Sequence, residues 1–242
     1  MNVLDLFSGI GGFSLGLERV GMKTIAFCEM DKKAQLVLKK HWPDVPIFND
    51  VSTLTGEQID TPVDVICGGF PCQDISLAGK GAGLEGARSG LWTEFHRLIK
   101  EIRPKYAIIE NVSALRSRGL DQVLRSLSEI GYDAEWHCIT AASVGAPHRR
   151  DRIWIVAYAK SKRVQGLWAS REQKLFAHEE ETIFMRYRKR LRKAHWEVEP
   201  SVARVVDGFP GRVDGVKQLG NAVVPQIPEL IGRAIIEREQ CQ

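Results

Sequence analysis

Short runs of apolar residues alternate with amphipathic stretches along the first part of the chain. The runs predict buried strands at Val3–Phe7, Lys23–Cys28, Val63–Gly68 and Tyr106–Glu110. The stretches between them have apolar residues at helical spacing, which predicts helices over 13–20, Asp31–His41, Leu91–Ile102 and Gly119–Ile130. This alternation is typical of an α/β fold, in which a largely parallel sheet is covered on both faces.

The remainder of the chain has a different pattern. Ala134–Ile139 and Arg152–Ala157 are predicted to pair as a hairpin at the end of the sheet. After Ala159 the periodicity weakens, and Thr182–Lys193 is predicted to form a helix with a basic face. A turn-rich stretch follows, and the chain closes with a short predicted helix, Pro228–Arg238.

Positive charge is concentrated in one segment. The formal net charge is +4, and Lys160–Lys193 holds eleven Lys or Arg and four Glu, a net +7 that leaves −3 for the rest. Such a segment favours a polyanion as partner, although a solvated basic helix has the same composition.

The composition, 44% hydrophobic and 26% charged, is that of a globular protein and excludes disordered and collagen-like chains. We expect no transmembrane helix and no secretory signal, because no long apolar run and no basic leader are present. The five cysteines form no CxxC pair, which favours a reducing cytoplasm over a disulfide framework or a metal site. We expect Cys28, Cys67 and Cys138 to be buried as small apolar residues.

A glycine-rich turn, Asp5–Gly12, follows the first predicted strand. It lacks the third glycine of a dinucleotide-binding turn, and no Gly-Lys-Ser/Thr follows as in a phosphate loop. Glu29 ends the second strand, where an acid can bind ribose hydroxyls, and Asp50 can accept a hydrogen bond from an adenine amine. The pattern favours S-adenosylmethionine over NAD, although such turns also occur without a ligand.

A Pro-Cys step follows the third predicted strand. Pro71 and Gln73 flank Cys72 in a turn, and a long Gly-rich loop, Asp74–Trp92, comes next. A thiol on a long loop beyond a parallel strand favours covalent catalysis. Glu110 ends the next strand, so we expect its carboxylate to share a cleft with the thiol.

Taken together, these segments resemble the DNA (cytosine-5)-methyltransferase family. The blocks that carry the resemblance occur in the family's order: Asp5–Phe13, Cys28–Asp31, Pro71–Gln73, Glu110–Val112, Gly145–Arg152 and Gln218–Pro225. The resemblance implies a class I S-adenosylmethionine-dependent methyltransferase fold, which is Rossmann-like with a mostly parallel sheet, and a small basic recognition subdomain.

The resemblance also implies the roles of the catalytic residues. Cys72 attacks C6 of a flipped cytosine, and Glu110 binds N3. Arg150 and Arg152 orient the base and hold the acid. The product is 5-methylcytosine in double-stranded DNA.

Further residues are assigned to binding by the same resemblance. Phe7 packs on the adenine, Glu29 binds the ribose, Asp50 meets the adenine amine, and the turn glycines make room for the methionine part. The S-adenosyl-L-methionine site as a whole comprises Phe7, Ser8, Gly9, Gly11, Gly12, Glu29, Met30, Asp50, Val51, Pro71, Leu91, Asn221 and Ala222. The substrate contacts are Gln73, Ser76, Asn111, Arg186, Arg188 and Lys189, and no metal is expected.

Two features depart from the family pattern. His148 stands where the family usually has Gln, and the recognition region is reduced to about 160–200. We therefore expect a catalytic and cofactor-binding domain at 1–159, a reduced recognition region, and a C-terminal segment, 201–242, that returns to the catalytic domain. Short or relaxed sequence specificity follows, because less surface reaches base edges.

The resemblance leaves the substrate open to alternatives. A tRNA cytosine-5 methyltransferase would share the chemistry, and a catalytically impaired DNA-binding protein would share the fold. The leading expectation is a monomeric DNA methyltransferase in the cytoplasm of a bacterial or phage-infected cell, which can act beside a cognate restriction endonuclease.

Overall fold

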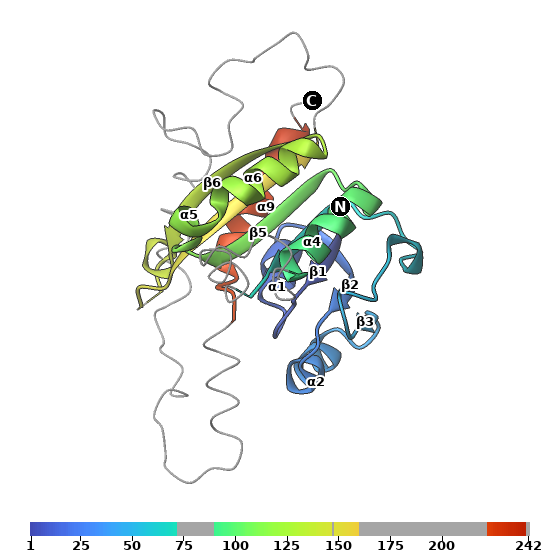
Figure 1. Cartoon of the computed structure of the whole chain (residues 1–242). Helices are drawn as coiled ribbons and strands as arrows, with labels where there is room; N and C mark the ends of the chain where they lie inside the picture. Colours follow the sequence, from blue (N-terminus) through green and yellow to red (C-terminus); the bar gives the residue numbers. More distant parts are fainter. Residues whose placement is uncertain (72–89, 147, 160–221, 241–242) are drawn as a thin grey trace.

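The computed structural model describes residues 1–71, 90–146, 148–159 and 222–240 (Figure 1). Its strands form one seven-stranded sheet in the order β3-β2-β1-β4-β5-β7-β6. The strands are β1 (Asn2–Leu6), β2 (Lys23–Cys28), β3 (Ile47–Phe48), β4 (Val65–Gly69), β5 (Tyr106–Val112), β6 (Tyr132–Thr140) and β7 (Asp151–Ala159). Among these strands, β7 is the one that runs antiparallel to both neighbours.

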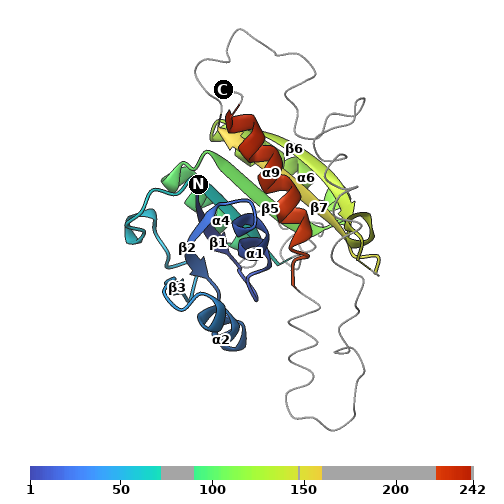
Figure 2. The ribbon, with the colours of Figure 1, turned by 180° about the vertical axis from the view of Figure 1, so that it is seen from behind.

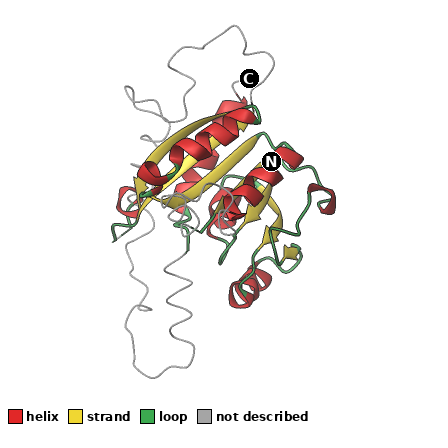
Figure 3. Ribbon diagram, in the orientation of Figure 1, coloured by secondary structure: helices red, strands yellow, loops and turns green. Residues whose placement is uncertain are grey.

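Helices cover both faces of the sheet (Figures 1 and 3). They are α1 (Gly12–Glu18), α2 (Lys32–His41), α4 (Gly90–Ile102), α5 (Leu115–Arg118), α6 (Leu120–Glu129) and α9 (Gln226–Gln240), with short 3-10 turns at η1 (Gly56–Gln58) and η3 (Ala141–Val144). Asp31 begins α2, since its carboxylate accepts hydrogen bonds from the backbone nitrogens of Lys33 and Ala34.

Side chains of successive strand residues point to opposite faces, so the continuous apolar strands supply two cores. On one face, Leu4, Ile66 and Ile109 pack with α4 and α6. On the other, Val3 and Ile108 pack with α1 and α9, which Figure 2 shows from behind. This double burial is why the strands lack the polar alternation of a half-exposed sheet.

The sheet order reverses between β1 and β4. From β1 the chain moves to β2 on one side, and it later returns to add β4 on the other side of β1. Ligands of open α/β sheets bind outside the carboxyl ends of the strands at such a switch point. The fold thus brings the turns after β1 and β4 to one edge.

Most predicted elements are confirmed, including the terminal hairpin, which forms β6 and β7. The closing helix is longer than predicted, at Gln226–Gln240, and β3 and α5 were not predicted.

The expectation for Cys138 is wrong: its side chain is exposed, because the edge strand β6 is not covered there, whereas Cys28 and Cys67 are buried. The predicted helix Thr182–Lys193 lies outside the described residues. None of the described helices is long and apolar enough to span a membrane.

The contact between α1 and α9 depends on small residues. A Cβ at Gly16 would overlap the carbonyl oxygen of Pro225 and lie 3.0 Å from the backbone nitrogen of Glu229. Both obstacles are backbone atoms, which cannot rotate away as a flexible side chain can. The approach of the C-terminal helix to α1 therefore requires glycine at this position.

Gly16→Ala is expected to lower the free energy of unfolding by about 1–3 kcal/mol, since overpacking outweighs the gain of about 1 kcal/mol in helix propensity. Urea unfolding measures the change. Gly90→Ala, at the start of α4, is the control because a Cβ there meets no described atom within 4 Å. Equal stability of Gly16→Ala and the wild type would contradict the close approach.

Candidate active site

The turn after β1 is shaped by left-handed backbone conformations. Phe7, Gly9 and Gly11 have φ angles of 51°, 54° and 84°. Glycine adopts this region freely, whereas Phe7 adopts it at a cost in strain. Its ring nevertheless lies 6.2 Å from the ring of Phe95 on α4, centroid to centroid. The packing of this ring against the core offsets the strain.

The turn glycines differ in what surrounds them. A Cβ at Gly11 would lie 2.6 Å from the ring of Trp42, and one at Gly12 would lie 2.5 Å from the carbonyl oxygen of Val223. A Cβ at Gly9 would meet nothing within 4 Å among the described residues. Protein groups therefore fill the space that a side chain would need at Gly11 and Gly12, whereas Gly9 faces open space among the described residues.

Glu29 connects the glycine turn to the end of β2. One carboxylate oxygen accepts a hydrogen bond from the backbone nitrogen of Gly9 at 2.7 Å, and the other accepts one from Asp31 at 2.7 Å. These bonds fix the carboxylate at the edge of the turn. Met30, the next residue, is 77% exposed.

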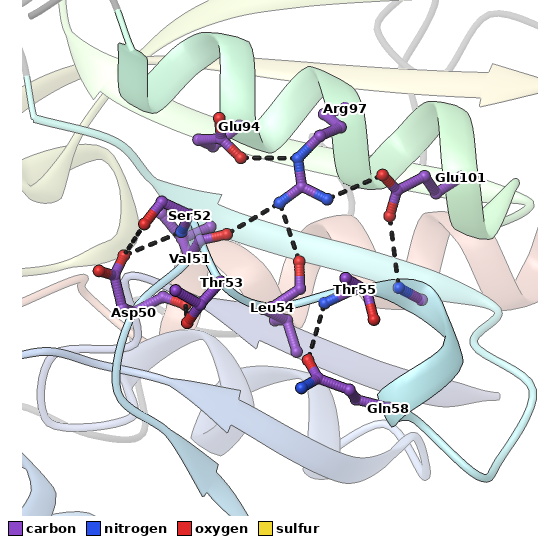
Figure 4. A network of polar contacts seen from close by, with 11 residues as sticks. Asp50, Val51, Ser52, Thr53, Leu54, Thr55, Gln58, Glu94, Arg97 and Glu101 are labelled. Atoms are coloured by element: carbon purple, nitrogen blue, oxygen red, sulfur yellow. Dashed lines mark hydrogen bonds and ion pairs between the residues drawn. The ribbon is translucent and has the colours of Figure 1, made fainter.

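Asp50 lies just beyond β3, on the loop that leads to η1 (Figure 4). Its carboxylate accepts hydrogen bonds from the backbone nitrogen of Ser52 at 2.9 Å and from the Ser52 hydroxyl at 2.7 Å. These bonds lower the pKa of Asp50. The side chain of Asp50 is exposed, while Val51 beside it is buried.

A second carboxylate is buried beneath the glycine turn. Asp5 accepts hydrogen bonds from the backbone nitrogen of Ser14 at 3.3 Å and from the Ser14 hydroxyl at 2.7 Å. Burial raises its pKa from 3.8 to about 8, although the bonds from Ser14 oppose the shift. Asp5 therefore ties the start of α1 to the centre of the sheet, in register with Cys67 on β4.

The ends of β4 and β5 bring an acid against a glycine. Glu110 lies in register with Gly69, and a Cβ at Gly69 would come within 2.7 Å of the Glu110 carboxylate. Arg152, from the antiparallel strand β7, approaches that carboxylate through its Nε at 2.9 Å. Burial raises the pKa of Glu110 even though the Arg152 and Arg150 guanidinium groups lower it. The site thus holds a carboxyl group that is suited both to bind and to give up a proton.

Asn111 fixes the chain just before the Pro-Cys step. Its side-chain amide donates a hydrogen bond to the carbonyl oxygen of Phe70 at 2.9 Å, and its side-chain oxygen accepts one from Val112 at 2.8 Å. Asn111 is buried, so it positions Phe70 and the exposed Pro71 that follows. Neither this role nor the requirement for glycine at position 69 was foreseen, although the Gly68–Gly69 pair before Pro71 was a visible signal.

The comparison with known proteins identifies the family of the chain. The family model for C-5 cytosine-specific DNA methylases matches residues 1–204. The chain belongs to this family. The Gly turn, Glu29, Glu110 and Arg152 all lie within the matched residues, and members of this family use S-adenosylmethionine and act on DNA.

Individual relatives agree with the family assignment. The chain is 39% identical over 166 residues to the type II methyltransferase M2.BsuMI of Bacillus subtilis (strain 168), covering 65% of this chain and 42% of the relative. It is 32% identical over 169 residues to M.HhaI of Haemophilus parahaemolyticus, covering 68% of this chain and 51% of the relative. The chain thus spans about half the length of the curated relatives it matches.

A solved structure shares the fold. A prophage-encoded protein of E. coli, described as a candidate DNA modification methyltransferase, superimposes with a TM-score of 0.58 and 29% sequence identity. The match covers 76% of this chain and 53% of that one. The class I methyltransferase fold predicted from the sequence is therefore confirmed.

Not every predicted site residue of this family member falls in the described part. Ser8 is buried, with its hydroxyl donating to the carbonyl oxygen of Asp5 at 2.6 Å. Leu91 packs against the core on α4, Ala222 is half-buried beside Val223, and His148 is exposed. The predicted residues outside the described ranges are Cys72, Gln73, Ser76, Arg186, Arg188, Lys189 and Asn221.

The raised pKa of Asp5 predicts a dependence of stability on pH. Asp5 binds a proton below about pH 8 in the folded chain but only below about pH 4 in the unfolded chain. The folded state therefore holds the extra proton between these values, and the wild type loses stability as pH rises through them. Asp5→Asn stays neutral, so its stability relative to the wild type should increase from about pH 4 to pH 8 and then level off.

Urea unfolding at a series of pH values measures this difference. Asp50→Asn provides a control of opposite sign, since the pKa of Asp50 is lowered and its charged form stabilises the fold. Its stability relative to the wild type should fall as pH rises through the acid range. A pH-independent difference for Asp5→Asn would show that Asp5 is charged in the folded protein.

Proposed function

We propose that this chain transfers a methyl group from S-adenosyl-L-methionine to C5 of cytosine in double-stranded DNA, through a transient bond between Cys72 and C6 of the base. The observation that carries the proposal is the ion pair between the buried Glu110 and the half-buried Arg152. Glu110 lies in register with Gly69, just before the Pro71–Cys72 step. A carboxyl group and a thiol on adjacent strand ends can act on one pyrimidine ring.

The residues around the glycine turn fit the adenosine part of the cofactor. Glu29 presents a fixed carboxylate for ribose hydroxyls, and Asp50 presents an exposed one for the adenine amine. The half-buried ring of Phe7 packs against Phe95 of the core, and Gly9 faces open space among the described residues. We assign the remaining contacts to Ser8, Gly11, Gly12, Met30, Val51, Pro71, Leu91, Asn221 and Ala222, through backbone atoms at Gly11 and Gly12. When bound, the cofactor supplies an electrophilic methyl group on a sulfonium.

The protein groups make the cytosine able to accept that methyl group. C5 of cytosine is a weak nucleophile, and addition of the Cys72 thiolate to C6 moves an electron pair toward C5. Glu110, held by Arg152 and near Arg150, gives a proton to N3 as negative charge develops on the ring, and it takes this proton back when the thiolate leaves. C5 then takes the methyl group as the bond between sulfur and methyl breaks, which leaves S-adenosyl-L-homocysteine. A base removes the C5 proton, and the thiolate leaves as the ring regains its double bond. The thiolate is the reactive form, so the site must favour it over the thiol.

The target atom lies inside the duplex, so the base must flip out of the helix. We assign substrate contacts to Gln73 and Ser76 and phosphate contacts to Arg186, Arg188 and Lys189. Asn111 donates one amide hydrogen to Phe70, which leaves the other for a substrate contact. Residues 160–200 are proposed to position DNA with little base readout, between the catalytic domain, 1–159, and the returning segment, 201–242.

The relatives are named type II methyltransferases, which supports a cognate restriction endonuclease as a functional partner. We propose that the chain acts as a monomer in the cytoplasm of a bacterial or phage-infected cell, where its DNA substrate is present.

The proposed activity is tested with S-adenosylmethionine that carries a labelled methyl group. The purified protein is offered unmethylated duplex DNA and, separately, tRNA, and the digested products are examined for 5-methylcytosine. Label in 5-methyldeoxycytidine is the expected result. Label found only in tRNA would show that the substrate is tRNA and not DNA. DNA binding without label in either nucleic acid would indicate a DNA-binding protein without this activity.

Cys72→Ser is expected to reduce methyl transfer by about a thousandfold or more, because a hydroxyl cannot replace the thiolate nucleophile. Cofactor binding should stay within about twofold of the wild type, as the variant removes no proposed cofactor contact. The matched control is Cys138→Ser, which alters an exposed thiol on β6 and should retain full activity. Normal turnover by Cys72→Ser would overturn the covalent mechanism.

Glu29→Ala is expected to weaken binding of S-adenosylmethionine by about tenfold or more, since it removes an acceptor for two ribose hydroxyls and frees the Gly9 nitrogen. Titration calorimetry measures the dissociation constant. Glu129→Ala, an exposed change at the end of α6, is the control. Unchanged binding by Glu29→Ala would place the ribose elsewhere.

A further inference from the structure

Arg97 joins α4 to the loop that follows β3. Its Nη2 donates hydrogen bonds to the carbonyl oxygens of Val51 at 3.0 Å and Leu54 at 2.8 Å (Figure 4). These carbonyls lie 46 and 43 positions away in the sequence. A single guanidinium nitrogen thus bridges two points of the loop.

Two carboxylates on α4 hold the guanidinium in this orientation. Nε of Arg97 contacts Glu94 at 2.6 Å, and Nη1 contacts Glu101 at 2.8 Å. Glu101 also accepts a hydrogen bond from the backbone nitrogen of Gly56 at 3.3 Å. The planar fork of arginine can make all these contacts at once, whereas a lysine ammonium cannot.

The braced loop begins with Asp50. The backbone nitrogens of Thr53 and Leu54 donate hydrogen bonds to the carbonyl oxygen of Asp50 at 3.3 and 3.2 Å, so Asp50 starts a tight turn. Arg97 binds the carbonyl immediately after Asp50 and the carbonyl at the end of that turn. The Asp50 side chain itself is exposed and bonds only within the loop, to Ser52, among the described contacts.

We propose that Arg97 is a positioning residue for the adenine of the cofactor: by bracing the carbonyls of Val51 and Leu54, it holds the Asp50 carboxylate where it meets the adenine amine. The inference rests on the proposed function, which assigns Asp50 to the adenine. Arg97 does not touch the cofactor. It acts through the shape of a loop that is otherwise exposed to solvent on the side of Asp50.

The test compares three single variants, Arg97→Met, Arg97→Lys and Asp50→Ala. A double variant combines Arg97→Met with Asp50→Ala. Titration calorimetry gives the dissociation constant of S-adenosylmethionine, and urea unfolding gives the stability of each variant. Lys100→Met, an exposed change on the same helix, is the matched control. In the methylation assay, kcat at saturating cofactor is compared with KM for the cofactor.

Arg97→Met is expected to weaken cofactor binding and raise its KM by about tenfold, with kcat within about twofold of the wild type. Arg97→Lys should restore little of the loss, because it lacks the fork. The double variant should bind S-adenosylmethionine no more than about twofold weaker than Asp50→Ala does, since both changes remove the same contact, that of Asp50 with the adenine. Lys100→Met should bind as the wild type does.

Wild-type binding by Arg97→Met would overturn the inference, as would losses that multiply in the double variant. Should Arg97→Met fail to fold, Glu94→Gln replaces it, because this change loosens the guanidinium without removing it. Weaker cofactor binding by Glu94→Gln that does not add to the loss in Asp50→Ala would support the inference, and wild-type binding would overturn it. A wild-type protein that binds no S-adenosylmethionine would instead overturn the proposed function, and the inference with it.

Discussion

The ion pair between the buried Glu110 and the half-buried Arg152 is the constraint around which the site is arranged. Burial of a carboxylate is costly, and replacing such pairs by apolar residues is often neutral or stabilising. Here the acid lies at the end of a parallel strand, and its partner comes from the antiparallel strand β7. A parallel β7 would present its opposite end at this edge. The direction of β7 and the lack of a side chain at Gly69 together allow a carboxyl group to sit inside the sheet edge.

Helix α4 is the common support of the segments that follow β1, β3 and β4. Phe95 contacts Phe7 after β1, Trp92 contacts Phe70 after β4 with ring centroids 5.3 Å apart, and Arg97 binds the loop after β3. These segments come from different parts of the sequence, and each would be mobile if it ended in solvent. One helix with two aromatic anchors and one ion network holds all of them, so their positions are linked through a single element.

The sequence predicts the strands well because burial on both faces makes each strand a short continuous run of apolar residues, a pattern that stands out along the chain. It misses β3, since Ile47–Phe48 is too short to show a pattern, and α5, which is a single turn. It places Cys138 in the core because an edge strand has the same composition as its neighbours, while only the tertiary arrangement shows which part is uncovered. The ordered blocks of the family supply the site residues. The contacts of Arg97 have no sequence signal, because they join a side chain to backbone carbonyls, which every residue has.

The glycines near the N-terminus show why a motif is hard to interpret without the fold. The turn has the composition of a ligand-binding loop, but the space beside Gly12 is filled by Val223 and that beside Gly16 by Pro225. Both partners belong to the segment that leads into α9, at the far end of the sequence. An ion pair between Glu229 and Arg19 at 3.4 Å adds to the contact, and Arg233 on the same helix holds the Glu229 carboxylate at 2.9 Å. Gly12 and Gly16 therefore allow the C-terminal segment to pack closely against the glycine turn and α1, and a chain that lacked this segment would leave them without that contact.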